Sequence, residues 1–286
     1  MKVLVTGAKG QLGTDVINEL AKRGHVAIGV GVAEMDITDS AAVRRVMTEA
    51  APEAVIHCAA WTAVDAAEDE ENRAKVKAIN VDGTENIAKV CQALGCKMMY
   101  ISTDYVFDGL GEEPWKPDCT SYAPQNYYGQ TKLDGERMVS GLLEKYFIVR
   151  IAWVFGKNGN NFVKTMLSIG KKYDTIRVVR DQIGTPTYTY DLARLLVDMV
   201  ETEKYGYYHA TNEGGYISWY DFACEIFKQA QYDTRVVPVT TAEYGLSKAE
   251  RPFNSRLDKS KLTENGFKLL PSWEDALRRY LQDGND

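Results

Sequence analysis

Five short apolar runs alternate with helical patterns through the first half of the chain. The segments between the runs carry apolar residues at helical spacing, as Leu12, Val16 and Leu20 do. Strand, helix and strand in repeated order require parallel strands joined by helical crossovers. The sequence therefore predicts an α/β fold with a doubly wound parallel sheet, whose strands lie near residues 2–6, 26–30, 54–58, 97–102 and 147–152.

The pattern changes after about residue 155. Three amphipathic helices are predicted near 192–200, 222–230 and 273–281, with short strand-like runs at 176–179 and 235–239. We expect residues 1–155 to form one domain and residues 156–286 to form mostly a smaller α/β lobe. The helix predicted within 185–205 is expected to return to the large sheet.

Charge and cysteine content exclude several classes of protein. Lys and Arg number 34 against 40 Asp and Glu, and this net charge of -6 argues against nucleic acid as a partner. No apolar run approaches the roughly 18 residues of a membrane span. The five cysteines and three histidines show no CxxC pair and no metal-like cluster. We therefore expect a cytoplasmic protein with no membrane segment and no metal site.

A glycine-rich segment, TGAKGQLG (6–13), follows the first predicted strand and begins the first helix. Gly7, Gly10 and Gly13 let the chain turn tightly and bring backbone N–H groups at a helix N-terminus close to a pyrophosphate. Residues 1–155 are therefore predicted to bind a dinucleotide. No acidic residue directly follows the second strand, but Glu34 and Asp36 lie nearby, which slightly favours NADH; the choice between NADH and NADPH stays open.

Three residues form a candidate catalytic set. Tyr128 and Lys132 are four residues apart, so they share one face of a helix. A cation on that face is expected to lower the pKa of the tyrosine, and Lys132 can also bind a ribose. Thr103, or failing it Ser102, ends the fourth strand and would offer a hydroxyl group to a reacting carbonyl oxygen.

With these motifs in this order, the chain resembles the extended short-chain dehydrogenases/reductases. Within them it is similar to the dTDP-4-dehydrorhamnose reductase family over almost its whole length. The resemblance implies a Rossmann sheet with a smaller, substrate-binding C-terminal lobe. The similar segments are HCAAWTAVDAAE (57–68), STDYVFDG (102–109), YYGQTK (127–132), IAWVFGKNGNNFVKTM (151–166), DQIGTPT (181–187), YHATNEG (208–214), SWYDFA (218–223) and RPFNSRLDKSKL (251–262).

The resemblance also implies roles for individual residues. Arg251 is expected to clamp a diphosphate, because a guanidinium group binds phosphate in a bidentate way. Trp61 departs from the family pattern, in which a His is frequent. The remaining sugar-nucleotide contacts would be Val64, Asp104, Trp153, Asn161 and Gln182. The cofactor, NADPH or NADH, would contact Gly7, Gly10, Gln11, Leu12, Gly13, Asp36, Ile37, Ala59, Ala60, Trp61, Thr62, Tyr128 and Lys132.

The activity that the resemblance implies is reduction of the C4 keto group of dTDP-4-dehydro-L-rhamnose. The related 4,6-dehydratases carry an Asp-Glu pair after the threonine, whereas here Asp104 is followed by Tyr105, so the base for that elimination is missing. Two alternatives stay open: a reductase of another nucleotide ketosugar, and a dinucleotide-binding regulatory subunit without catalysis. The sequence also leaves a homodimer and a Mg²⁺ requirement open.

Overall fold

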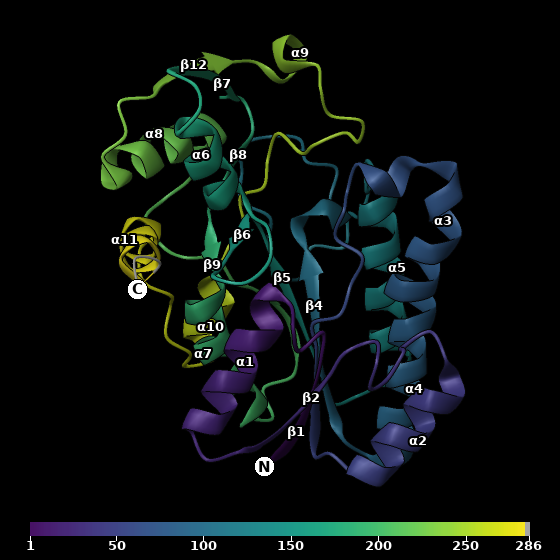
Figure 1. Cartoon of the computed structure of the whole chain (residues 1–286). Coiled ribbons are helices and arrows are strands. Elements are labelled where there is room, and N and C mark those ends of the chain that lie inside the picture. Colours follow the sequence, from purple (N-terminus) through teal and green to yellow (C-terminus); the bar gives the residue numbers. More distant parts are fainter. Residues whose placement is uncertain (284–286) are drawn as a thin grey trace.

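The computed structural model describes residues 1–283 and contains a six-stranded parallel sheet (Figure 1). The strand order is β10-β5-β4-β3-β1-β2, and every neighbouring pair is parallel. Five strands match the five predicted apolar runs and confirm the predicted fold class. These five are β1 (Lys2–Thr6), β2 (Val26–Val30), β3 (Ala54–His57), β4 (Lys97–Thr103) and β5 (Tyr146–Ile151).

The sixth strand, β10 (Gly206–His209), was not predicted from the sequence. It has only four residues, GYYH, and two of them are half-buried, so it lacks the apolar run that marks the other strands. Its pairing with β5 joins residues about sixty positions apart, as in the register of Tyr207 with Ile148. Only the tertiary structure identifies it as a strand of the main sheet.

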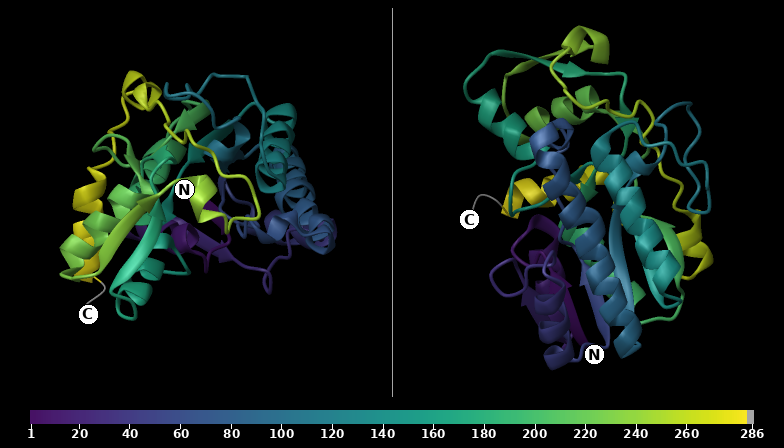
Figure 2. Two further views of the ribbon diagram at one scale, coloured as in Figure 1. Left: turned by 90° about the horizontal axis from the view of Figure 1, so that it is seen from above. Right: turned by 90° about the vertical axis from the view of Figure 1, so that its right-hand side faces the viewer.

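Helices cover both faces of this sheet (Figures 1 and 2). On one face, α1 (Gln11–Lys22) packs against α7 (Thr189–Val200), and both bury apolar side chains in one core with β1 and β5. On the other face lie α2 (Ser40–Ala50), α4 (Gly83–Leu94) and α5 (Tyr127–Leu142). Between β3 and α4 the chain forms η1 (Ala66–Glu68), α3 (Glu70–Lys77) and the π-helical turn η2 (Ala78–Asp82), and η3 (Asp104–Val106) follows β4.

A smaller group of elements lies above the carboxyl ends of the sheet in Figure 1 and has its own apolar core. Its strands pair as β12 with β7, β11 with β8, and β6 with β9. The predicted runs at 176–179 and 235–239 form the β7–β12 pair. The strands are β6 (Val154–Phe155), β7 (Thr175–Val179), β8 (Ile183–Gly184), β9 (Thr187–Tyr188), β11 (Ile217–Ser218) and β12 (Arg235–Val239).

The remaining helices are α6 (Phe162–Gly170), α8 (Trp219–Ala230), α9 (Thr241–Tyr244), α10 (Ser260–Glu264) and α11 (Trp273–Asp283). Leu262 of α10 and Leu192 of α7 both belong to the core of the main sheet, although they lie far along the chain. The domain boundary near residue 155 stays a prediction. None of the helices within residues 1–283 is long and apolar enough to cross a membrane.

Candidate active site

A cavity of about 1280 Å³ lies between the carboxyl ends of the main strands and the smaller group of elements. Its walls come from the ends of β1 to β5, from the glycine segment and from the start of α5. Parallel α/β sheets place their ligand sites at this edge because the loops after the strands gather there. Most of the predicted site residues therefore meet in one place.

The glycine segment forms a close turn at one end of the cavity. Gly7 has a φ of +63°, and a Cβ atom added there would lie 2.9 Å from Ala59 N. A Cβ atom on Gly13 would lie 2.1 Å from Gly7 O, so only glycine fits at that position. Gly7, Gly10, Gln11 and Leu12 line the cavity, whereas Gly13 packs behind the turn. This cradle fits a dinucleotide pyrophosphate at the N-terminus of α1.

Gln11 connects the glycine segment to the loop that follows β6. Its Nε2 donates to Asn160 O at 3.2 Å, and its Oε1 accepts from Asn161 Nδ2 at 3.0 Å. Gly159 and Asn160 line the cavity, but Asn161 does not, because its Oδ1 caps α6 by accepting from Lys164 N. The structure thus brings Asn161 next to the glycine segment and away from the cavity wall.

A carboxylate lies at the end of β2 even though no acidic residue directly follows that strand. Glu34 Oε2 accepts from Gly31 N at 2.8 Å, and Glu34 Oε1 pairs with Lys9 Nζ at 3.2 Å. Asp36 and Ile37, both predicted to contact the cofactor, line the cavity. Lys9 also lines it and was not among the predicted residues, although its place inside the glycine motif was the available signal.

The segment after β3 carries the next predicted cofactor contacts. Ala59, Ala60 and Thr62 line the cavity, whereas Trp61 does not, because its indole Nε1 donates to Ala63 O at 3.0 Å. The backbone N–H of Trp61 donates to Asn80 Oδ1 at 2.8 Å. Asn80, in the π-helical turn, was missed by the sequence analysis because nothing in its sequence context marks this long-range contact.

Thr103, Tyr128 and Lys132 all line the cavity, as the motif predicts for one helix face beside one strand end. Thr103 is 6% exposed, and its Oγ1 donates to Asp104 Oδ1 at 3.0 Å. Ser102, the alternative hydroxyl, donates instead to Glu136 Oε1 at 2.5 Å. Both hydroxyl groups line the cavity and both donate to a carboxylate, but Thr103 also hydrogen-bonds with Tyr128, so it stays the candidate for the group that reaches a substrate oxygen.

Lys132 packs against β4. Its Nζ donates to Ile101 O at 2.7 Å and lies 4.0 Å from the centroid of the Tyr100 ring. Burial lowers the pKa of Lys132 to about 7, while the negative charge of Glu136 acts in the opposite direction.

The expected lowering of the Tyr128 pKa is wrong for this arrangement of side chains. Burial raises the pKa of Tyr128 above its ordinary value, and the charge of Asp104 and the neighbouring Tyr105 add to the rise. A hydrogen bond with Thr103 opposes them and lowers the same pKa. Tyr128 is therefore protonated at neutral pH, which is the form that can donate a proton.

Three predicted substrate contacts, Val64, Asp104 and Trp153, also line the cavity. Asp104 is 2% exposed, and its Oδ2 has no hydrogen-bond partner among residues 1–283. Burial raises the pKa of Asp104 to about 6, although hydrogen bonds with Ser255 and Thr103 partly oppose this rise. Trp219, which the sequence analysis did not single out within SWYDFA, lines the cavity beside Trp153.

Besides Asn161, two further predicted substrate contacts lie outside the cavity wall. Gln182 is buried and donates from Nε2 to Thr241 Oγ1 at 3.0 Å. Arg251 pairs through Nη2 with Asp65 Oδ2 at 2.7 Å, and its Nη1 lies 3.4 Å from the Tyr105 hydroxyl oxygen. A diphosphate clamp by Arg251 stays a prediction. In the part of the chain from residue 1 to 283, no three His, Cys, Asp or Glu side chains group so as to hold a metal ion.

A proton donor and a strand-end hydroxyl group share this cavity with a glycine cradle for a dinucleotide. This combination on a doubly wound sheet defines an extended short-chain dehydrogenase/reductase. More specifically, the chain belongs to the RmlD substrate binding domain family, whose model matches residues 1–285.

Individual relatives agree with this assignment. The chain is 41% identical over 280 residues to dTDP-4-dehydrorhamnose reductase of Streptomyces griseus, covering 96% of this chain and 91% of the relative. It is 39% identical to the spore coat polysaccharide biosynthesis protein SpsK of Bacillus subtilis, over 99% of this chain and 97% of SpsK. The solved structure of dTDP-4-dehydrorhamnose reductase from Bacillus anthracis in complex with NADP has a TM-score of 0.94 and 43% identity, covering 99% and 100% of the two chains.

Proposed function

We propose that the protein reduces the C4 keto group of dTDP-4-dehydro-L-rhamnose to give dTDP-L-rhamnose, with NADPH or NADH as reductant. The observation that carries this proposal is the meeting of protonated Tyr128, Thr103 and the glycine cradle in one cavity. The relatives named dTDP-4-dehydrorhamnose reductase support the choice of substrate, and the NADP complex supports the choice of cofactor.

The chain's own residues would act on the substrate oxygen. When bound, the reduced nicotinamide supplies a hydride to the sugar C4. Tyr128 gives its phenolic proton to the C4 oxygen as negative charge develops there, and Thr103 donates a second hydrogen bond to the same oxygen. Lys132, charged below its pKa of about 7, would hold the cofactor ribose.

Reduction without elimination fits the residue that follows Asp104. Tyr105 stands where the related 4,6-dehydratases would need a carboxylate, and its ring contacts Tyr128 edge-on with centroids 5.7 Å apart. Burial raises the pKa of Tyr105 to about 12, so it is not a base at neutral pH. We therefore propose that the protein catalyses reduction and not 4,6-dehydration.

The test is nicotinamide absorbance with purified protein, each coenzyme in turn, and dTDP-4-keto-6-deoxyglucose with and without a 3,5-epimerase. Coenzyme oxidation that needs the epimerase is the expected result. Tyr128→Phe should lose roughly 10²–10⁴-fold in kcat while it binds dTDP nearly normally, since a positioned acid contributes about that much. Full turnover by this variant contradicts the assignment of Tyr128.

The same assay distinguishes two other functions. Oxidation with a different nucleotide ketosugar indicates a reductase of another substrate. Coenzyme binding without turnover of any ketosugar indicates a regulatory subunit. We further propose that the protein acts in the cytoplasm without a membrane partner, and that it binds no nucleic acid, which its net charge of -6 supports. A homodimer stays a prediction, which sedimentation equilibrium can test.

A further inference from the structure

A fully buried ion pair lies directly behind the candidate catalytic residues. Arg150 of β5 is 0% exposed and Glu136 of α5 is 1% exposed, and they form two hydrogen bonds, Nε to Oε1 at 2.8 Å and Nη2 to Oε2 at 2.7 Å. Arg150 also donates to the Tyr122 hydroxyl oxygen at 2.9 Å and to Pro117 O at 3.2 Å. Buried ion pairs add little net stability compared with apolar residues, so stability alone does not explain the pair.

The pair connects the two elements that carry the candidate catalytic residues. Ser102 Oγ donates to Glu136 Oε1 at 2.5 Å, and Ser102 immediately precedes Thr103 on β4. Glu136 lies one turn after Lys132 and two turns after Tyr128 on α5, so all three share a helix face. Glu136 therefore helps to fix the distance between the end of β4 and this helix face, together with the bond from Lys132 Nζ to Ile101 O.

The pair also determines the charge around Lys132. The titratable groups around Lys132 are His57 on β3, Cys58 just after that strand, Tyr100 on β4, and Tyr128 and Glu136 on its own helix; the pKa of Tyr128 is raised, so it is neutral. Burial lowers the pKa of His57 to about 3 and raises the pKa of Cys58 to about 12, so both are neutral at pH 7. Burial also raises the pKa of Tyr100. Among these groups Glu136 supplies the negative charge.

We propose that Glu136 and Arg150 are a positioning pair for the reduction: through Ser102 the pair holds Thr103 against the helix of Tyr128, and through Glu136 it keeps Lys132 charged. Neither residue touches the substrate. The inference rests on the proposed function, because it assigns these residues to the same reaction. The charges of Glu136 and Arg150 together would set the pH range in which Lys132 is protonated and can hold the cofactor ribose.

The experiment measures kcat/KM against pH for the parent and for two variants with opposite charge changes. Glu136→Gln removes the carboxylate and leaves Arg150 unpaired, which disfavours the Lys132 cation, so the loss of activity at high pH should begin about one pH unit lower. Arg150→Met leaves the carboxylate unpaired, which favours the same cation, so that loss should move to higher pH. Shifts in opposite directions support the proposal.

A purely structural role predicts a different result. In that case both variants lower the melting temperature and the total activity, while the pH at which activity falls stays that of the parent; this outcome overturns the proposal. The Kd of NADPH is measured over the same pH range without sugar. Its pH dependence should shift in the same two directions, and this readout separates failure of the inference from failure of the proposed substrate.

Ser102→Ala tests the mechanical part if the charge variants do not fold. It removes the bond from β4 to Glu136 but keeps the ion pair. We expect kcat to fall about tenfold with an unchanged pH profile and an unchanged NADPH Kd, since small displacements of catalytic groups are costly. An unchanged kcat overturns the proposed role of the pair in holding Thr103.

Discussion

Trp153 and Trp219 stack face to face in the cavity wall, with ring centroids 3.7 Å apart and planes inclined by 15°. Trp153 follows β5 of the main sheet, and Trp219 begins α8 of the smaller group. Trp153 has a φ of +51°, a conformation that is strained for a residue with a bulky side chain. A Cβ atom on Gly184 would lie 2.9 Å from Trp153 Cε2, so the small residue makes room for the stack.

The first prediction concerns this stack. Trp219→Ala removes the ring that supports Trp153, and aromatic pairs contribute about 1 kcal/mol beyond their buried area. We expect the KM for the sugar nucleotide to rise about fivefold to tenfold, while the KM for the coenzyme stays unchanged. Trp219→Phe is the matched control, and its KM for the sugar nucleotide should lie between those of the parent and of Trp219→Ala. An unchanged sugar-nucleotide KM in Trp219→Ala would show that the stack does not shape the substrate site.

The second prediction concerns coenzyme choice at the end of β2. Glu34 is held at Gly31 N, where it can accept from a ribose 2′-hydroxyl group, and Lys9 beside it can pair with a 2′-phosphate. Lys9→Gln should lower kcat/KM for NADPH about tenfold and leave NADH nearly unaffected, because charged hydrogen bonds contribute about 1.5 kcal/mol. Glu34→Gln should move the ratio toward NADPH. Equal effects on both coenzymes would contradict this assignment.

The third prediction concerns the pH dependence of stability at Asp104. Burial raises its pKa from 3.8 to about 6 in the folded protein, so the folded state binds the proton more tightly than the unfolded state. The free energy of unfolding therefore falls as the pH rises from about 4 to 6, by up to about 3 kcal/mol, and is level above that range.

Asp104→Asn removes this titration and provides the test. Chemical denaturation at several pH values should show the variant gaining stability relative to the parent between pH 4 and 6. A difference between variant and parent that is the same at every pH would contradict the raised pKa. Asp174→Asn, at an exposed position just before β7, is the control and should show no such gain.

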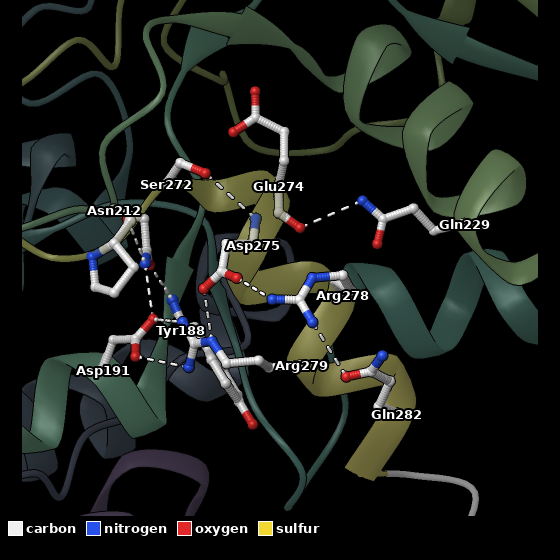
Figure 3. Close-up of polar contacts among 11 residues, drawn as sticks. Tyr188, Asp191, Asn212, Gln229, Ser272, Glu274, Asp275, Arg278, Arg279 and Gln282 are labelled. Atoms are coloured by element: carbon white, nitrogen blue, oxygen red, sulfur yellow. Dashed lines mark hydrogen bonds and ion pairs between the residues drawn. The ribbon is translucent and has the colours of Figure 1, made fainter.

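The fourth prediction concerns how the C-terminal helix is attached. Figure 3 shows Arg279 of α11 between Asp191 and Asp275, with its guanidinium group near the ring of Tyr188. Arg279 Nη1 and Nη2 bond to the two Asp191 oxygens at 2.9 and 2.6 Å, and the Asp191 side chain is 1% exposed. Asn212 Nδ2 donates to the same carboxylate at 2.9 Å.

Arg279→Ala leaves the Asp191 carboxylate buried without its cation, which should lower the free energy of unfolding by about 3 kcal/mol. Arg278, one residue earlier, is the matched control, because it is exposed and pairs with Asp275 and Gln282 at the surface (Figure 3). Arg278→Ala should cost less than about 1 kcal/mol. The free energy of unfolding is measured by denaturant titration. Similar losses in both variants would show that the buried Arg279–Asp191 contact stabilises the protein no more than the exposed contacts of Arg278 do.

Much of the fold can be predicted from local patterns in the sequence. Each of the five predicted strands is a short apolar run, and each crossover helix repeats apolar residues at helical spacing, so the period of hydrophobicity predicts them. β10 was missed because GYYH becomes a strand only through its bonds with β5. The same limit explains Asn80, whose contact with the Trp61 backbone connects segments that no local pattern relates.

In the candidate site, too, local patterns predicted some features and only the tertiary structure decided the others. The residue types and their spacing determined the glycine cradle and the pair of Tyr128 and Lys132, because these depend on one turn and one helix face. The tertiary structure decided that Lys132 bonds to Ile101 O, that Arg251 pairs with Asp65 and that Trp219 supports Trp153. Those contacts join distant segments, and burial, which sets the pKa of Tyr128, exists only once the whole chain has packed around it.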